Sequence, residues 1–276
     1  MSARLGIVAG RGGLPLRLAR ACVAAGRPVF VLVLEGQADA GTFRDFPSAS
    51  VPLGRGGEAI SILRSEGVEE LVFAGGVGRP SLSSLYPDAR TARFLAKVGM
   101  RALGDDRIMT LIVRELEQEG FRVVGADEVL TDLLPETGRL GSEEPDAIAR
   151  EDIRRGISVT LALGRADCGQ AAVVQQGVVL AIEAVEGTDA MIERAGGLRR
   201  DGPGGVLVKL AKPQQERRID LPTIGVETVR RAAAAGLRGI AVEAGGSLIV
   251  DRTAVIAEAD RLGLFLVGIR PGAEGA

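Results

Sequence analysis

The chain contains no histidine among its 276 residues. This absence excludes Ser-His-Asp and Cys-His catalysis, histidine-ligated zinc and a histidine general base together. Chemistry must then rest on Asp, Glu, Lys, Arg, hydroxyls, backbone groups and the single tyrosine, Tyr86. Hard cations bound through oxygen ligands, and phosphate chemistry, suit that set of groups.

Aromatic residues are scarce, at 3% with no tryptophan, so the core must be built from Ala, Val, Leu and Ile. Such a core packs well between helices and a buried sheet. Long apolar runs are missing too, and none approaches the roughly 20 residues that cross a bilayer. Any membrane contact is therefore expected to be peripheral.

Cysteine is limited to Cys22 and Cys168, which both lie in Ala- and Val-rich sequence. We expect buried packing for both, because a cysteine nucleophile needs a nearby base and histidine is absent. The start of the chain lacks the basic-then-apolar layout of a signal peptide. These features predict a reducing, cytoplasmic location.

Basic residues do not dominate the charge, since 34 Lys and Arg face 36 Asp and Glu, for a net charge of −2. No basic run stands out along the chain. Sequence-independent nucleic-acid binding depends on clustered Lys and Arg that neutralise phosphates. We therefore expect no nucleic-acid partner.

The first half of the chain alternates short apolar runs with segments of helical spacing. Residues 4–9 form an apolar run, residues 14–25 have helical spacing, and residues 28–36 form a second apolar run. The alternation continues and predicts a parallel sheet with helices on its faces. We assign residues 1–133 to a Rossmann-like N-terminal domain of the α/β class.

The second half has a different pattern. Residues 134–150 are rich in Pro, Gly and charge, and they predict a linker. Residues 151–276 mix helices with probable hairpins at Gly177 and at Gly245 and Gly246. This mixture predicts a mixed-sheet α/β domain that is not a second Rossmann domain.

Two glycine-rich loops follow predicted strands of the first domain. The loop at 9–15 contains Gly10, Gly12 and Gly13, and the loop at 74–80 carries Arg79. Both emerge at the same edge of a parallel sheet, so they can face one ligand. Backbone N–H groups at a helix N-terminus can hold a phosphate, although tight structural turns also explain the glycines. The first loop is not a full G-x-G-x-x-G, because Pro15 occupies the last position, so NAD(P) binding is only an alternative.

Two polar segments of the second half carry the densest candidate chemistry. Within residues 209–225, the stretch 212–220 contains seven charged or amide side chains, and Pro213 and Pro222 stiffen its ends. A solvated loop is the competing interpretation. Residues 183–189 place Glu183, Glu186 and Asp189 around the turn at Gly187 and Thr188. Helix capping explains Thr188, whereas the glutamates leave a metal-binding or hydroxyl-binding role open.

Several separated motifs resemble one known family over nearly the whole chain. In the first half they are A-G-x-G-x-L-P at 9–15, A-G-x-x-x-R-P at 74–80 and G-D-D at 104–106. In the second half D-V-G-Q resembles residues 167–170, with Cys168 in place of Val, and E-x-x-E-G-T-D matches residues 183–189. K-P-x-Q-D-x-R-x-D-x-P-x-I-G matches residues 212–225, with Glu216 in place of Asp. The chain thus resembles the LpxI-type UDP-2,3-diacylglucosamine pyrophosphatases of lipid A biosynthesis.

The resemblance implies a ligand held between a Rossmann-like domain and a C-terminal domain peculiar to the family. It implies magnesium-dependent hydrolysis of UDP-2,3-diacylglucosamine to 2,3-diacylglucosamine 1-phosphate (lipid X) and UMP. It also implies a homodimer, and the lipid substrate suggests a peripheral position at the cytoplasmic face of the inner membrane. The family's essential aspartate corresponds to Asp220.

From these residues we expect the following roles. Asp220 would ligate Mg²⁺ or orient the water, with Glu186 as a further metal ligand. Catalytic assistance would come from Gln215 and Glu216. Substrate or phosphate contacts would come from Lys212, Arg218, Thr188, Asp189, Gln170, Gly10, Gly12 and Arg79. A non-catalytic sugar-nucleotide or lipid-binding protein, and an NAD(P)-dependent oxidoreductase, are the alternatives.

Overall fold

The computed structural model describes residues 2–78, 86–98 and 105–272. By its internal contacts the chain forms two compact units. Unit 1 comprises Met1–Leu130 and Glu216–Asp220, and unit 2 comprises Thr131–Gln215 and Leu221–Ala276. A five-residue segment from the second half of the sequence therefore belongs to the first unit.

Unit 1 is built on a parallel five-stranded sheet in the order β3-β2-β1-β4-β5. Leu5 pairs with Val29 on one side and with Glu70 on the other. The central strands are almost wholly apolar because both faces of the sheet are covered. The strands are β1 (Leu5–Ala9), β2 (Val29–Leu34), β3 (Ser48–Val51), β4 (Glu70–Ala74) and β5 (Arg122–Val124).

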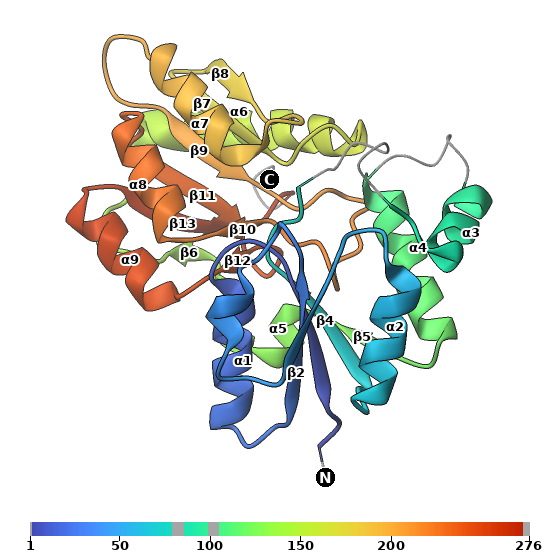
Figure 1. Ribbon diagram of the computed structural model, residues 1–276. Helices are drawn as coiled ribbons and strands as arrows, with labels where there is room; N and C mark the ends of the chain where they lie inside the picture. Colours follow the sequence, from blue (N-terminus) through green and yellow to red (C-terminus); the bar gives the residue numbers. More distant parts are fainter. Residues whose placement is uncertain (1, 79–85, 99–104, 273–276) are drawn as a thin grey trace. The chain divides into compact units, whose positions relative to one another are not determined.

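Helices cover both faces of this sheet, and Figure 1 shows α1 and α2 on opposite sides of it. Ile60 and Leu63 of α2 and Val113 of α4 pack with the strands in one core cluster. On the other face α1 packs on β1 and β2 and touches α5. The helices are α1 (Leu14–Ala24), α2 (Gly56–Ser65), α3 (Ala89–Val98), α4 (Asp105–Gln118) and α5 (Ala126–Val129), with a 3₁₀ turn at Ala40–Phe43.

Unit 2 contains a mixed six-stranded sheet in the order β6-β13-β11-β9-β7-β8. β9, β11 and β13 run parallel, whereas β7 is antiparallel to β8 and β9, and β6 is antiparallel to β13. The strands are β6 (Gly138–Arg139), β7 (Ala171–Gln175), β8 (Val178–Ile182), β9 (Val206–Lys209), β11 (Gly239–Glu243) and β13 (Phe265–Ile269). A separate parallel pair joins β10 (Thr223–Ile224) to β12 (Leu248–Ile249).

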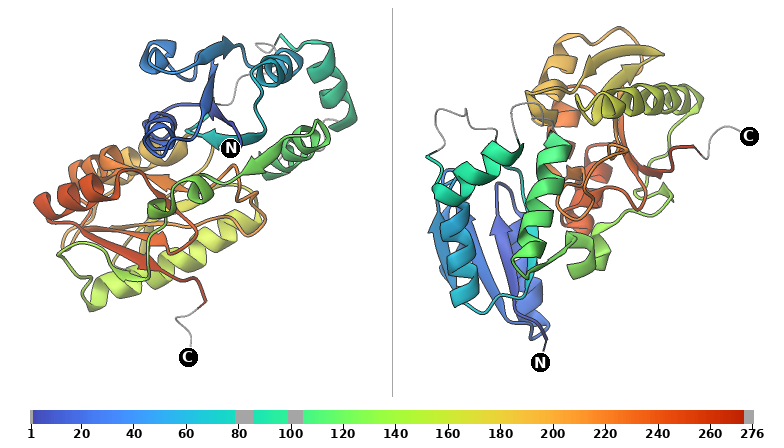
Figure 2. Two further views of the ribbon diagram at one scale, coloured as in Figure 1. Left: turned by 90° about the horizontal axis from the view of Figure 1, so that it is seen from below. Right: turned by 90° about the vertical axis from the view of Figure 1, so that its right-hand side faces the viewer.

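The two faces of this sheet are covered unequally. α7 (Gly187–Gly197), α8 (Val226–Ala234) and α9 (Arg252–Arg261) pack their apolar faces into one cluster on one side. α6 (Ala147–Arg165) packs on the other side, over β7 and β9. Figure 2 shows α6 as one long, continuous yellow-green helix. A 3₁₀ turn at Thr131–Leu133 begins the unit.

The structure confirms the α/β class, with a parallel sheet in the first half and a mixed sheet in the second. The predicted hairpin at Gly177 is also confirmed, since β7 and β8 meet at Gln176 and Gly177, both with positive φ. The second predicted hairpin is wrong. β11 pairs with β9 and β13, while β12 pairs with β10.

The segment 134–150, predicted as a linker, contributes secondary structure to unit 2. Its residues Gly138 and Arg139 form β6, which pairs with the edge of β13. The last part of the segment begins α6, which Asp146 caps by accepting a hydrogen bond from the Ala149 amide. A two-residue strand is too short to show the alternation that identifies strands in a sequence.

Candidate functional site

The two glycine loops of unit 1 lie side by side at the carboxyl ends of β1 and β4. The Gly10 amide donates to the Ala74 carbonyl at 2.8 Å. Arg11 and Gly76 exchange backbone hydrogen bonds of 2.8 and 3.1 Å. A Cβ atom at Gly10 would lie 2.6 Å from the Gly76 oxygen, so only glycine fits there.

This pairing limits what the first loop can bind. The Gly10 amide is already used within the protein, so an anion at this helix N-terminus would meet the amides that follow it. Gly12 has a φ of +93° and no atom near its missing Cβ, which places it in the open part of the turn. Arg79, the predicted phosphate contact of the second loop, lies outside the described residues, as does Gly104.

In unit 2 a chain of buried polar groups starts at the end of β9. Lys209 Nζ donates to Thr188 Oγ1 at 2.8 Å and to the Thr223 carbonyl at 3.1 Å. Thr188 Oγ1 in turn donates to Glu183 Oε1 at 2.6 Å. Thr188 was expected to cap α7, but Glu186 holds the N-cap position, so the Thr188 hydroxyl serves this chain instead.

The chain of hydrogen bonds continues into the other two motifs of the second half. The backbone N–H of Gln170 donates to Glu183 Oε2 at 3.1 Å. The side-chain oxygen of Gln170, Oε1, accepts from Gln215 Nε2 at 3.3 Å. Gln215 Oε1 accepts from the Lys212 amide at 3.0 Å. Lys212 Nζ then forms an ion pair of 2.7 Å with Asp167.

The local backbone explains why residues 167–170 have their composition. Asp167 adopts a φ of +50°, a left-handed conformation that aspartate tolerates better than most residues. A Cβ atom at Gly169 would lie 2.1 Å from the Glu183 carbonyl oxygen. Glycine therefore lets this turn approach the end of β8 closely enough for the Gln170 amide to reach the Glu183 carboxylate.

We call Asp167, Gln170, Glu183, Thr188, Lys209, Lys212 and Gln215 the polar network. Glu183, Lys209, Lys212 and Gln215 are each less than 10% exposed. Buried charges persist when they are paired and hydrogen-bonded, as they are here. Two lysines balance two carboxylates, so a diphosphate that bound beside the network would bring negative charge that the network alone does not neutralise.

Sequence reasoning placed Gln170, Thr188, Lys212 and Gln215 in the site, and the structure joins all four. It did not select Lys209 or Asp167, and it left only an open metal-binding or hydroxyl-binding role for Glu183. These three residues connect the four. The sequence did contain one indication for Lys209. It ends an apolar strand of four residues, and a lysine at such a position is buried together with its charge. The partner of that charge could not be inferred, because Thr188 and Glu183 come from another part of the chain.

The continuation of the same segment, Glu216–Asp220, packs within unit 1. Arg218 binds both Glu216 oxygens at 2.9 Å and also pairs with Glu117 of α4 at 2.6 Å. The hydrogen bonds from Arg218 lower the pKa of Glu216. A lowered pKa makes this carboxylate a weaker base, so Glu216 suits an ion pair better than general-base catalysis. Asp220 is half-buried at the end of the segment.

The other predicted acidic residues are held in surface ion pairs. Glu186 pairs with Arg194 at 2.6 Å, and Asp189 lies 3.5 Å from Arg231. The pKa of Glu186 is lowered by a hydrogen bond from its own backbone amide and by Arg194. Glu186 would have to leave Arg194 to ligate a metal.

A magnesium ion would depend on the carboxylates of the site. Among the described residues no three acidic, cysteine or histidine side chains form a group that could hold a metal ion. Mg²⁺ needs less than that, because it is usually bound by one or two carboxylates together with substrate phosphates and water. Asp220 supplies one carboxylate of this kind, and Glu186 and Glu216 are each paired with an arginine.

The two cysteines differ in their surroundings. Cys22 is buried in α1, as predicted, and its burial raises the pKa of the thiol. Cys168 is exposed, so the expectation of buried packing is wrong for it. The turn at 167–169 directs this side chain outward while its backbone packs against β8. Within the described part of the chain, no helix is long and apolar enough to span a membrane.

Two solved structures show a weak likeness to this chain. CobK precorrin-6A reductase gives a TM-score of 0.36 at 13% identity, covering 100% of this chain and 90% of that chain. The biotin carboxylase subunit of pyruvate carboxylase gives 0.23 at 14% identity, covering 63% and 35%. Likenesses of this size support no conclusion about fold or function.

Sequence comparisons are far more specific. Residues 4–133 match the model of the LpxI N-terminal domain, and residues 136–267 match that of the LpxI C-terminal domain. The chain is 47% identical over 275 residues to the UDP-2,3-diacylglucosamine pyrophosphatase LpxI of Caulobacter vibrioides, covering 97% of this chain and 98% of that protein. Both domains are matched in order and almost completely, and the chain therefore belongs to the LpxI family.

Proposed function

We propose that this protein hydrolyses the pyrophosphate bond of UDP-2,3-diacylglucosamine, releasing 2,3-diacylglucosamine 1-phosphate (lipid X) and UMP in lipid A biosynthesis. The relative from Caulobacter vibrioides, 47% identical over nearly the whole chain, is named for this pyrophosphatase activity. The observation that carries the proposal is the polar network, in which three motifs of that family meet through buried hydrogen bonds.

The chemistry of the chain agrees with this reaction. Pyrophosphate cleavage requires neutralised oxygens, an oriented water and a stabilised leaving phosphate, and it needs no covalent nucleophile. Carboxylates, lysines and amides supply these functions without histidine. Lys212 is the phosphate-binding cation that we assign to the network, and Gln170 and Gln215 hold its backbone in place.

Asp220 has the central role in this proposal, as the ligand of Mg²⁺ or the group that orients water. When bound, Mg²⁺ would supply positive charge to the phosphate oxygens. Arg218 is tied to Glu216 and Glu117, so it would contact a phosphate only after releasing one of them. Thr188 donates its hydroxyl hydrogen to Glu183, so we assign it to the support of the network.

We further propose that the protein acts as a homodimer at the cytoplasmic face of the inner membrane. The acylated substrate supports the peripheral position, because each buried methylene contributes about 0.8 kcal/mol of binding free energy. The family resemblance supports the dimer.

Incubation of the protein with UDP-2,3-diacylglucosamine, with and without Mg²⁺, tests the activity directly. We expect release of UMP that depends on the metal, measured by chromatography of the nucleotide products. Substrate binding without UMP release under any divalent metal would instead identify a non-catalytic binding protein. A change in nicotinamide absorbance on mixing with NAD(P)H would identify an oxidoreductase.

The Asp220→Ala variant tests the assignment of that residue. We expect UMP release to fall at least about a thousandfold while the variant stays folded and still binds substrate, because removal of a catalytic group costs chemistry more than affinity. Asp201→Ala, at an exposed turn away from the motifs, is the matched control and should keep full activity. Turnover of Asp220→Ala near that of the control would remove Asp220 from the mechanism.

A further inference from the structure

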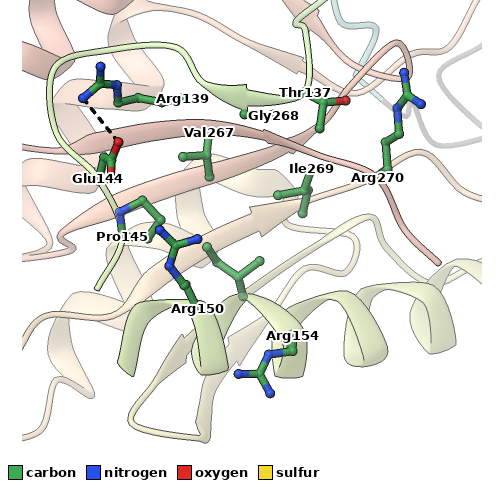
Figure 3. Close-up of a pocket in the computed structure, with 12 residues that line it drawn as sticks. Thr137, Arg139, Glu144, Pro145, Arg150, Arg154, Val267, Gly268, Ile269 and Arg270 are labelled. Carbon is green, nitrogen blue, oxygen red and sulfur yellow. Dashed lines mark ion pairs between the residues drawn. The ribbon is translucent and has the colours of Figure 1, made fainter. Parts of the chain in front are cut away.

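A groove on unit 2 lies beside α6, and none of its lining residues belongs to the motifs described above. α6 makes most of its contacts with the sheet at β7 and β9, and its first turns lie next to the groove, whose opposite side is lined by β13 and β6. There the structure leaves a cavity of about 590 Å³, shown in Figure 3. Cavities of roughly 300 to 1,000 Å³ are typical of small-molecule sites.

The walls of this groove carry an excess of positive charge. Its lining includes Arg139, Arg150, Arg154 and Arg270 against one acidic residue, Glu144. Arg139 pairs with Glu144 at 3.3 Å, and Arg154 pairs with Glu151 at 2.5 Å. In the described part of the chain Arg150 and Arg270 form no ion pair, which leaves two uncompensated guanidinium groups on a protein whose net charge is −2.

The floor of the groove is aliphatic. Ile153, Val267 and Ile269 line it and are 3%, 6% and 6% exposed. Figure 3 shows Arg150 and Arg270 on different sides of the floor formed by Val267 and Ile269. Arginine side chains commonly lay their methylene stems over apolar surface and keep their charge in water. A ligand in the groove would meet apolar side chains below and positive charge around it.

This composition selects one ligand chemistry over others. A guanidinium group presents a planar fork of donors that matches phosphate geometry. The lining contains no aromatic side chain on which a nucleotide base could stack, and its net positive charge disfavours a cation. We propose that this groove binds a phosphate monoester carried on an aliphatic body, with Arg150 and Arg270 supplying the charge and Val267 and Ile269 contacting the aliphatic part.

Two sources can supply such a ligand, a lipid with a phosphate headgroup in a bilayer or a free acylated phosphate. The groove does not depend on the pyrophosphatase activity, so both can be tested without the substrate. Calorimetric titration with short-chain, monomeric phosphatidate measures the free ligand. Co-sedimentation with phosphatidylcholine vesicles, with and without phosphatidic acid, measures the bilayer. Inorganic phosphate and a short poly-glutamate peptide complete the probes.

The test variant is Arg150→Gln combined with Arg270→Gln, both exposed positions whose replacement breaks no ion pair within the described residues. The matched control is Arg155→Gln combined with Arg165→Gln, two exposed arginines of α6 that do not line the groove. We expect the control to bind monomeric phosphatidate like the wild type. The test variant should bind at least about tenfold more weakly, since each lost charge-assisted hydrogen bond alone accounts for such a factor.

Each outcome decides the proposal. Equal binding by the test and control variants would overturn it, and so would inorganic phosphate or the peptide binding as tightly as phosphatidate. Vesicle binding that requires phosphatidic acid and is lost in the test variant assigns the site to a bilayer lipid. If the wild type binds monomeric phosphatidate but not the vesicles, and the test variant loses the monomer binding, the site belongs to a free acylated phosphate. The test variant should keep UMP release from UDP-2,3-diacylglucosamine. The binding probes do not contain this substrate, so failure of UMP release in the wild type would leave the phosphatidate-binding result unaffected.

Discussion

At the scale of single residues, Lys209 joins parts of the molecule that lie far apart in the sequence. Its ammonium group contacts the Thr188 hydroxyl and the Thr223 carbonyl, and through Thr188 it reaches Glu183. The side chain is only 6% exposed, so these contacts replace the water that a lysine normally keeps. A buried ammonium group held in this way fixes the position of every group bound to it.

Replacing Lys209 by Met should therefore destabilise the protein. The change keeps the length of the side chain but leaves the Thr223 carbonyl and Thr188 without their donor, and a buried group left unpaired costs about 1–3 kcal/mol. Urea unfolding should show this loss in the free energy of unfolding. Lys97→Met, at an exposed position of α3, should change it by less than about 0.5 kcal/mol. Equal stabilities for the two variants would show that the contacts of Lys209 contribute nothing net.

At this scale the sequence identified which residues take part in the site better than it identified their hydrogen-bond partners. Thr188 beside Gly187 at a helix start suggests a cap, because capping is a local interaction that can be read from neighbouring residues. Its actual acceptor, Glu183, directly follows β8, and its donor, Lys209, belongs to β9. Pairings of this kind depend on which strands become neighbours, and no local pattern encodes that.

At the scale of elements, the contact between α6 and the sheet depends on a glycine. Gly156 lies in the buried face of α6, and a Cβ atom there would lie 2.4 Å from a methyl carbon of Val208 in β9. Glycine normally costs about 1 kcal/mol in a helix relative to alanine. Its presence here lets the helix approach the strand more closely than any side chain would allow.

The Gly156→Ala variant should lose stability despite its better helix propensity. Overpacking a buried contact costs about 1–3 kcal/mol, which exceeds the gain of about 1 kcal/mol from alanine. The matched variant is Gly197→Ala in α7, where no atom lies near the added Cβ and stability should stay equal or rise. Thermal unfolding of both variants measures the difference. An increase in Tm for Gly156→Ala would show that α6 can move away from β9 at little cost.

Glu258 connects α8 to α9 and makes the stability of this pair depend on pH. It accepts hydrogen bonds from Arg261 on its own helix and from Arg230 on α8, which lower its pKa to about 2. A carboxylate with a lowered pKa stabilises the fold above its ordinary pKa, and this contribution is lost as the pH falls toward the folded value. Glu258→Gln should therefore be less stable than wild type near neutral pH.

The difference between wild type and Glu258→Gln should shrink as the pH falls from about 5 toward 2. Urea unfolding across this range measures it. Glu193→Gln, at an exposed position of α7, is the control and should show no such trend. A difference that stays constant with pH would mean that the Glu258 charge is not responsible for it.

The elements themselves were largely predictable, whereas their pairing was only partly so. Apolar runs of five or six residues identified β1 and β2, and helical spacing identified α1 and α4, because these patterns are local. β10 and β12 contain two residues each, too few for a pattern, and their parallel pairing replaced a predicted hairpin. The turn residues Gly245 and Gly246 indicate a change of direction without saying which strand follows.

At the scale of the whole molecule, the chain crosses between its units more often than its sequence suggests. Residues 212–225 read as one polar segment, yet Glu216–Asp220 belongs to unit 1 and the residues on either side belong to unit 2. Ile219 packs against the core cluster that includes residues of α2 and α4, and Arg218 pairs with Glu117. A domain boundary drawn at one point of the sequence could not have predicted this.

Ile219 therefore fixes the position of Asp220, the next residue along the chain. Ile219→Ala removes the apolar anchor of the segment and should lower kcat for UMP release by about tenfold to a hundredfold, since small misplacements of a catalytic group have effects of that size. Stability should fall by about 1–2 kcal/mol, less than for a fully buried isoleucine. Ile256→Ala removes the same atoms from a half-buried position in α9 and should lower Tm similarly while leaving kcat unchanged. Equal kcat values for the two variants would show that the anchoring of this segment in unit 1 does not position Asp220 for catalysis.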